Sequence, residues 1–180
     1  NQVEEGEHLE NGFPAYSSVW GDKANYGNRG ERYLAGVAFL EGADKKPSAV
    51  MCRGYYTRSY LWAVDFDGKE LKTKWLHASL TPNDWKVTDA EGKVLKEAHG
   101  CKATAYAQGA HSLAVGDVDG DGRDEITYGS AAINPDGTLL YSTGLGHGDA
   151  QHLADLDPDR PGLEYYMVHE EYPYGSDLRD

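Results

Sequence analysis

Two acidic segments of this chain repeat each other, and this repeat restricts the possible folds more than any other feature. Leu113–Asp121 (LAVGDVDGD) is echoed by His152–Asp159 (HLADLDPD), and the first aspartates of the two copies lie 38 residues apart. A degenerate third copy, Ala35–Gly42, carries Phe39 in place of the first aspartate. Repeats of about 40 residues that contain several short strands are typical of β-propeller blades. The repeat therefore predicts an all-β fold of propeller type.

The segments around the repeats have the pattern of short strands joined by turns. After a polar lead-in at residues 1–33, apolar strands are predicted at 34–40, 49–53 and 60–66. Three Asp-Gly or Glu-Gly pairs predict hairpins with type I′ turns, at 67–68, 91–92 and 136–137. No segment shows a convincing helical period. The stretch 67–112 is expected to carry extra loop, because its hairpin signal and the next repeat are far apart.

A closed propeller needs at least about four blades. The 180 residues have room for two or three blades and part of a fourth. The chain is therefore expected to be a partial propeller domain over residues 1–180, with blades from about residue 34 and with further blades as its partners. Its first residues lack the basic and apolar regions of a signal peptide, but such a peptide could have been removed, so this does not place the protein.

The charge balance excludes some partners. The chain has 17 Lys and Arg against 30 Asp and Glu, a net charge of -13, so nucleic acid and anionic membrane surfaces are not expected to bind it. No apolar run approaches the roughly 20 residues of a membrane span. Bound divalent cations would offset much of the acidic charge. Cys52 and Cys101 could form a disulfide, although two thiols do not decide this.

The first acidic loop has the spacing of a calcium site. Calcium takes six to eight oxygen ligands, which a tightly curled loop supplies from alternate residues. The opening resembles an EF-hand loop, but the twelfth position is Tyr128 and the flanks are strand-like. We therefore predict a calcium loop between two strands, with four side-chain ligands and the Arg123 carbonyl as a backbone ligand. The side chains are those of Asp117, Asp119, Asp121 and Glu125.

The second acidic loop has the same design with one extra residue. Asp155, Asp157 and Glu164 are its predicted calcium ligands, and Asp159 is a further candidate. Prolines stiffen this loop and reduce the entropy lost when it becomes ordered. The copy that contains Phe39 is expected to bind no ion.

Histidines and carboxylates recur near the repeat boundaries. His111 and His147 lie 36 residues apart, about one repeat, so they would occupy equivalent places in successive blades. Asp149 and Glu170 would lie nearby. Imidazole is a softer ligand than oxygen, so this set by spacing alone would favour zinc, manganese or iron over calcium. The alternative is that these histidines are buried in blade packing.

Taken together, the motifs resemble rhamnogalacturonan lyases of polysaccharide lyase family 11. The resemblance covers roughly residues 20–180, and the stretch 76–100 departs from the family pattern. Its matching segments are 26–29 (YGNR), 33–38 (YLAGVA), 53–58 (RGYYTR), 115–129, 141–150 (YSTGLGHGDA), 156–158, 160–164 and 168–170.

This resemblance implies an eight-bladed propeller that holds several Ca²⁺ ions and acts outside the cytoplasm, extracellular or periplasmic. The activity implied is β-elimination in the rhamnogalacturonan backbone of acidic plant pectin. The resemblance also implies that His111, His147, Asp149 and Glu170 share a calcium beside the cleft, which overrides the preference for zinc. The two acidic loops match structural calcium sites of the family. Basic residues associated with catalysis in the family lie in blades that this chain lacks.

Four residues of the 53–58 motif are candidates for contact with sugar and uronate: Arg53, Tyr55, Tyr56 and Arg58. No catalytic base is assigned. Two other functions fit the same motifs. One is a non-enzymatic, calcium-dependent propeller module for adhesion or glycan binding. The other is a metal-dependent hydrolase that uses zinc in the histidine cluster.

Overall fold

The computed structural model describes residues 9–10, 13–14, 33–54, 56–170 and 173–180. All its regular elements are β-strands, so the predicted all-β class is confirmed for these residues. Tyr55 and nearly all of the polar lead-in, including the 26–29 motif, lie outside them. Within them, no helix is long and apolar enough to cross a membrane.

The largest sheet is an antiparallel meander of six strands. Its strands are β3 (Tyr33–Ala38), β4 (Ser48–Arg53), β5 (Ser59–Phe66), β6 (Leu71–Thr81), β7 (Asp84–Thr88) and β8 (Val94–Ala98). The first three agree with the predicted strands to within two residues. The expectation of extra loop in 67–112 is confirmed only for residues 99–113, because the long β6 and the β7–β8 hairpin occupy most of the preceding stretch. Val87 and Trp85 on β7 pack into the main core, which explains why this hairpin is ordered.

Two smaller antiparallel sheets follow along the chain. The four-stranded sheet contains β9 (Ala114–Gly116), β10 (Glu125–Tyr128), β11 (Ala131–Ile133) and β12 (Leu139–Ser142). The three-stranded sheet contains β13 (Gly148–Ala154), β14 (Glu164–His169) and β15 (Ser176–Arg179). A separate short pair near the start joins β1 (Leu9–Glu10) and β2 (Phe13–Pro14).

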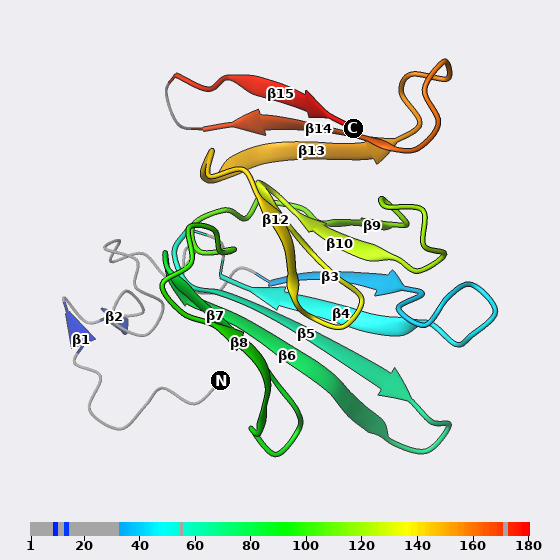
Figure 1. Ribbon diagram of the computed structural model, residues 1–180. Coiled ribbons are helices and arrows are strands. Elements are labelled where there is room, and N and C mark those ends of the chain that lie inside the picture. The colour runs from blue at the N-terminus through cyan, green and yellow to red at the C-terminus, as the bar shows by residue number, and fades with distance from the viewer. Residues whose placement is uncertain (1–8, 11–12, 15–32, 55, 171–172) are drawn as a thin grey trace.

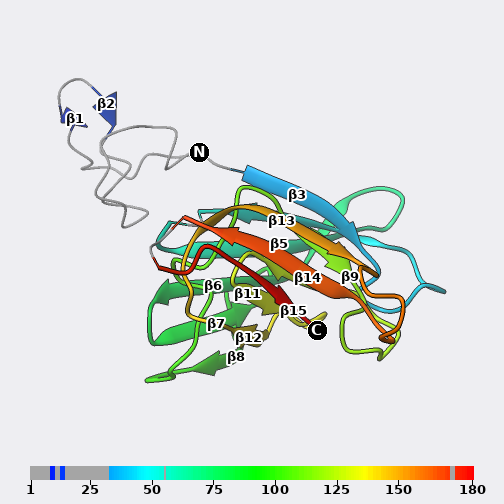
Figure 2. The ribbon, with the colours of Figure 1, turned by 90° about the horizontal axis from the view of Figure 1, so that it is seen from above.

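The three main sheets lie one above another in chain order (Figure 1), and they overlie each other when seen from above (Figure 2). The first strand of each sheet contacts the first strand of the next, β3 with β9 and β9 with β13. Glycines permit this approach: a Cβ added at Gly36 would lie 2.9 Å from Leu113 Cδ1, and one at Gly116 would lie 3.1 Å from Leu153 Cδ2. The sheets form an open stack that is not closed on itself.

Apolar side chains fill the space between neighbouring sheets. Leu61 and Trp75 from the six-stranded sheet pack with Ile126, Tyr128 and Ile133 from the four-stranded one. The buried Tyr128 hydroxyl also donates a hydrogen bond to the Gly54 carbonyl. A smaller cluster of Ala110, Tyr165 and Met167 joins the next pair of sheets. Burial of apolar surface contributes about 25 cal/mol per Å² to the free energy of folding. These apolar layers are therefore the main source of stability.

The three predicted hairpin turns exist, but they are not of type I′. That type requires positive φ at both central residues, whereas the only non-glycine residue with positive φ in the described part of the chain is Ala107. In the turn before β12, Gly137 alone takes a φ of 84° and its N–H bonds the Asn134 carbonyl at 2.9 Å. The disulfide left open by the sequence does not form, because Cys52 and Cys101 are free thiols.

Candidate metal centre

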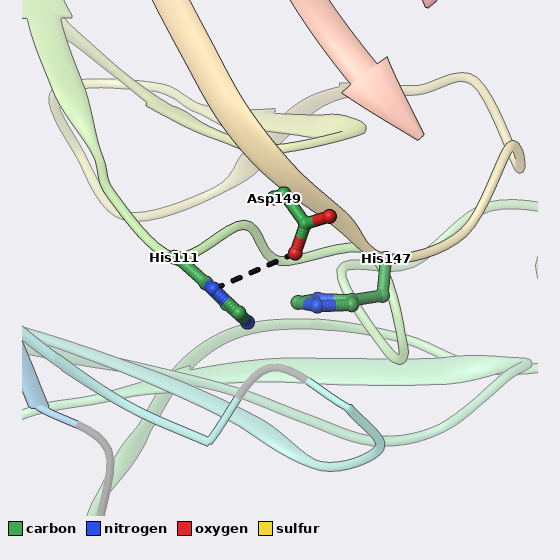
Figure 3. Close-up of side chains that lie close together, drawn as sticks. All are labelled: His111, His147 and Asp149. Carbon is green, nitrogen blue, oxygen red and sulfur yellow. Dashed lines mark ion pairs between the residues drawn. The ribbon is translucent and has the colours of Figure 1, made fainter. Parts of the chain in front are cut away.

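Three of the four predicted cluster residues meet where the last two sheets join (Figure 3). His111 precedes β9, His147 directly precedes β13, and Asp149 is the second residue of β13. His111 Nδ1 lies 3.6 Å from Asp149 Oδ1, and the two imidazole centroids are 4.9 Å apart. One ligand atom from each residue lies within 4.8 Å of the others. This is a compact group of two nitrogens and one oxygen.

Local backbone geometry aims two of these side chains. The β13–β14 register shifts between Gly148 and Ala150, so Asp149 is the extra residue of a β-bulge, a feature that redirects a side chain. Gly148 is needed for close packing, since a Cβ there would lie 2.1 Å from the Val168 carbonyl oxygen. Only Gly146 of the two glycines that flank His147 has positive φ, at 82°.

His147 is held as a neutral imidazole with one defined tautomer. Its side chain is 5% exposed, and burial lowers its pKa below the ordinary value. Its Nδ1 lies 2.6 Å from the Gly109 carbonyl, which can only accept, so Nδ1 carries the proton. Nε2 therefore carries the lone pair and is the ring nitrogen that could bind a metal. Glu170 lies on that side, with Oε2 3.6 Å from Nε2.

The predicted sugar-contacting residues do not form one group. Tyr56 belongs to the histidine cluster: its hydroxyl lies 3.1 Å from His111 Nε2, and its ring centroid is 4.4 Å from that of His147. Arg53 instead lies over the Tyr33 ring, 5.3 Å from its centroid, in a cavity of about 560 Å³ on the six-stranded sheet. Arg58 is half-buried in the turn before β5, and Tyr55 is outside the described residues.

The first acidic loop brings together part of its predicted ligand set. Carboxylate oxygens of Asp117, Asp119 and Glu125 lie within 4.8 Å of one another. Asp121 is drawn away by Arg123, whose guanidinium forms an ion pair with it and holds the pKa of Asp121 below its ordinary value. The Asp117 carboxylate accepts backbone N–H groups within the loop, including Gly120 at 2.8 Å. The loop is thus curled by its own carboxylates.

Glu125 is the buried member of this loop. It is fully buried, and its Oε2 accepts the Val118 N–H at 2.9 Å. Its Oε1 is also buried and has no hydrogen-bond partner among the residues that the structure describes. Burial raises the pKa of Glu125, and with the smaller effect of the charges on Asp119, Asp121 and Asp117 it reaches about 7, although the Val118 hydrogen bond lowers it. A carboxylate of this kind fits a bound cation, which would satisfy the orphaned oxygen.

The second acidic loop has the same buried glutamate but a looser arrangement of aspartates. Glu164 occupies the same register position as Glu125, and its Oε2 accepts two loop N–H groups, from Leu156 at 2.7 Å and Asp157 at 3.0 Å. Arg160 pairs with Asp157 at 3.3 Å. Asp155, Asp157 and Glu164 do not form a tight cluster in the described structure. Asp159 contributes its N–H to Asp157.

The degenerate third copy is paired with a fixed positive charge, Lys74 on β6. Ser48 stands at the register position that glutamate occupies in the other two copies, and its hydroxyl bonds Asp65 at 2.5 Å. The Lys74 ammonium lies 2.6 Å from Glu41, which corresponds to Asp119 in the first loop, and 3.5 Å from Asp65. The Lys74 ammonium group therefore neutralises Glu41 of this loop together with Asp65 on β5.

Comparison with known proteins decides the family. A family model described as rhamnogalacturonan lyase family 11, C-terminal domain, matches residues 13–180. The chain belongs to this family. The resemblance drawn from the motifs is confirmed.

Named relatives support the same assignment. The chain is 52% identical over 164 residues to the rhamnogalacturonan exolyase YesX of Bacillus subtilis, covering 89% of this chain and 23% of that protein. It is 47% identical over 173 residues to the endolyase YesW of the same organism, covering 93% and 24%. The crystal structure of YesX and a Bacillus licheniformis rhamnogalacturonan lyase structure match with TM-scores of 0.73 and 0.72, each at 48% identity and over 92% of this chain. They are matched over 24% and 25% of their own chains. The chain thus spans about a quarter of the length of these relatives.

Two side chains that hold the turn before His147, those of Ser130 and Gln108, were not identified from the sequence. The Ser130 hydroxyl donates to the Gly146 carbonyl at 2.7 Å, and the Gln108 side chain accepts the Gly146 N–H at 3.1 Å. Both fix the turn that carries His147. Isolated serine and glutamine residues in loops carry no spacing signal, so only the folded structure could identify them.

Proposed function

We propose that this chain is part of the catalytic propeller of a rhamnogalacturonan lyase, which cleaves the acidic pectin backbone by calcium-assisted β-elimination. Family membership at 52% identity to an exolyase carries this proposal. The stacked sheets, joined through their first strands, are consistent with an arc of propeller blades completed to eight by further blades. The natural setting would be extracellular or periplasmic.

The reaction removes the C5 proton of a uronate, forms an enolate-like anion and expels the sugar linked at O4. Calcium bound at the histidine cluster would stabilise the negative charge that develops beside the uronate carboxylate. His147 offers Nε2, His111 offers Nδ1, Asp149 offers a carboxylate oxygen, and Glu170 adds negative charge beside His147 Nε2. With a net charge of -13, the chain would otherwise repel an anionic polysaccharide.

The acidic loops are proposed as structural calcium sites. The orphaned, buried Oε1 of Glu125 supports the first of them. In the second, Glu164 has the same register position and burial, and Asp155 and Asp157 would close around the ion only if Arg160 released Asp157. Each loop joins two neighbouring strands, so an ion there would clamp a sheet and leave the cleft chemistry untouched.

The test is a chimera in which this chain replaces the corresponding quarter of the Bacillus subtilis exolyase. We expect calcium-dependent release of unsaturated product, detected by ultraviolet absorbance from rhamnogalacturonan. His147→Ala should abolish this release. His152→Ala, at an exposed histidine on β13 five residues further along the chain, should retain it. The isolated 180-residue chain should show little turnover.

Three results would contradict the proposal. Saturated product would indicate hydrolysis, full activity in chelator would exclude calcium assistance, and binding of intact glycan without cleavage would indicate an adhesion module. Equal melting temperatures of the two chimeric variants would show that a loss of turnover is not a folding defect.

A further inference from the structure

The two imidazoles of the metal centre are held through different nitrogens. His147 bonds the Gly109 carbonyl through Nδ1, which leaves Nε2 toward the cluster. His111 is turned the other way: its Nε2 lies 3.1 Å from the Tyr56 hydroxyl, and its Nδ1 faces Asp149 at 3.6 Å. The centre is therefore asymmetric, although the two histidines lie about one repeat apart.

We infer that Tyr56 is a positioning residue that commits His111 to bind the cation through Nδ1. This inference rests on the proposed metal centre. A metal-binding nitrogen must present its lone pair, so the proton of a neutral His111 must then sit on Nε2. The Tyr56 hydroxyl oxygen is placed to accept that proton's hydrogen bond. Partners of this kind orient metal-binding histidines and fix their tautomer.

The position of Tyr56 in the fold connects the first sheet to the histidine cluster. Tyr56 lies in the connection between β4 and β5 of the six-stranded sheet, whereas His111 and His147 precede the first strands of the next two sheets. Its ring also contacts His147, with centroids 4.4 Å apart. One side chain thus ties the first sheet to both histidines. The hydroxyl and the ring have separate roles, which a Tyr-to-Phe change separates.

The experiment compares Tyr56→Phe with a matched control, Tyr166→Phe, at a tyrosine in the middle of β14 opposite His152 and Leu178. Nitrogen-15 spectra of the calcium-loaded chain should show His111 protonated at Nε2. A calcium titration followed through the His147 ring signals should show Tyr56→Phe weakening binding at this centre by about 10–100-fold. The Tyr166→Phe chain should bind as the parent does.

The failures of the two proposals are distinguishable. Protonation of His111 at Nδ1 in the loaded chain, or unchanged calcium affinity in Tyr56→Phe, would overturn the role of Tyr56 while leaving the metal centre in place. Calcium that fails to move the His147 signals of the parent chain would overturn the metal centre itself.

Discussion

Substitution of Glu125 by glutamine should have opposite effects on stability with and without calcium. Glu125 is fully buried, and one of its oxygens lacks a hydrogen bond within the described structure. In the cation-free chain, burial raises its pKa from 4.5 to about 7. At about 1.4 kcal/mol per unit, this corresponds to about 3 kcal/mol against folding once the carboxylate is ionised.

The sign of the pH dependence follows from this shift. Because the folded-state pKa lies above the unfolded value, folding is favoured while Glu125 stays protonated. Cation-free stability should therefore fall as the pH rises from about 4.5 through about 7. Glutamine stays neutral and can still accept the Val118 N–H, so the variant should escape this loss. At pH 8 in chelator it should be more stable than the parent by up to about 3 kcal/mol, or about 6–12 °C in melting temperature.

With saturating calcium the order should reverse, because the variant has lost a charged ligand of the loop. Urea unfolding followed by tryptophan fluorescence at pH 5, 6, 7 and 8, with calcium and with chelator, measures both effects. Asp44→Asn, an exposed acid in the degenerate loop, is the charge-matched control. A pH profile shared by parent and variant in chelator would refute the argument for Glu125. A calcium stabilisation that survives the substitution intact would refute its role as a ligand.

Three further changes test other parts of the structure. Asp119→Ala should remove much of the calcium-dependent rise in melting temperature, whereas His147→Ala should leave most of it. Equal losses would contradict the proposal that the loop ion is structural and the ion at the histidine cluster faces the substrate. Gly148→Ala should destabilise the fold by about 1–3 kcal/mol, because the new Cβ would clash with the Val168 carbonyl; an unchanged calorimetric melting temperature would contradict the packing described. Lys74→Met should lower stability by about 1 kcal/mol to the same extent in calcium and in chelator, and a loss that calcium restores would contradict its role as a fixed charge.

Much of the fold could be predicted because its determinants are local. The acid spacing at Asp117 and Asp119 places a loop between two strands, and apolar runs such as 60–66 become strands that are buried in part. The type of the hairpin turns could not be predicted, since Asp-Gly pairs also fit turns in which only glycine takes positive φ. The Glu91-Gly92 pair indicated the turn of the β7–β8 hairpin, but not that its strands would extend the six-stranded sheet, because that depends on Trp85 and Val87 packing against distant core residues.

The candidate site also has features that the sequence could predict and features that depend on the folded structure. Equivalent positions in successive repeats brought His111 and His147 together, as their spacing indicated. The spacing could not show that Arg123 would draw Asp121 out of its loop, because either side chain has several rotamers that satisfy the sequence pattern. Nor could it place Tyr56 in the histidine cluster and Arg53 away from it, because that difference depends on how the residues after β4 turn.

Lys74, which lies on β6 and pairs with the degenerate loop, has a consequence for the order of unfolding. An ammonium group joined to the chain cannot be diluted or chelated, so Glu41 in the loop between β3 and β4 keeps its partner in calcium and in chelator alike. On calcium withdrawal, amide hydrogens of β9–β10 and β13–β14 should exchange first, while those of β3–β6 remain protected. The six-stranded sheet also leaves the ribosome before the other two. The segment synthesised first would thus become ordered without metal and act as a template for the two sheets whose acidic loops are proposed to bind calcium.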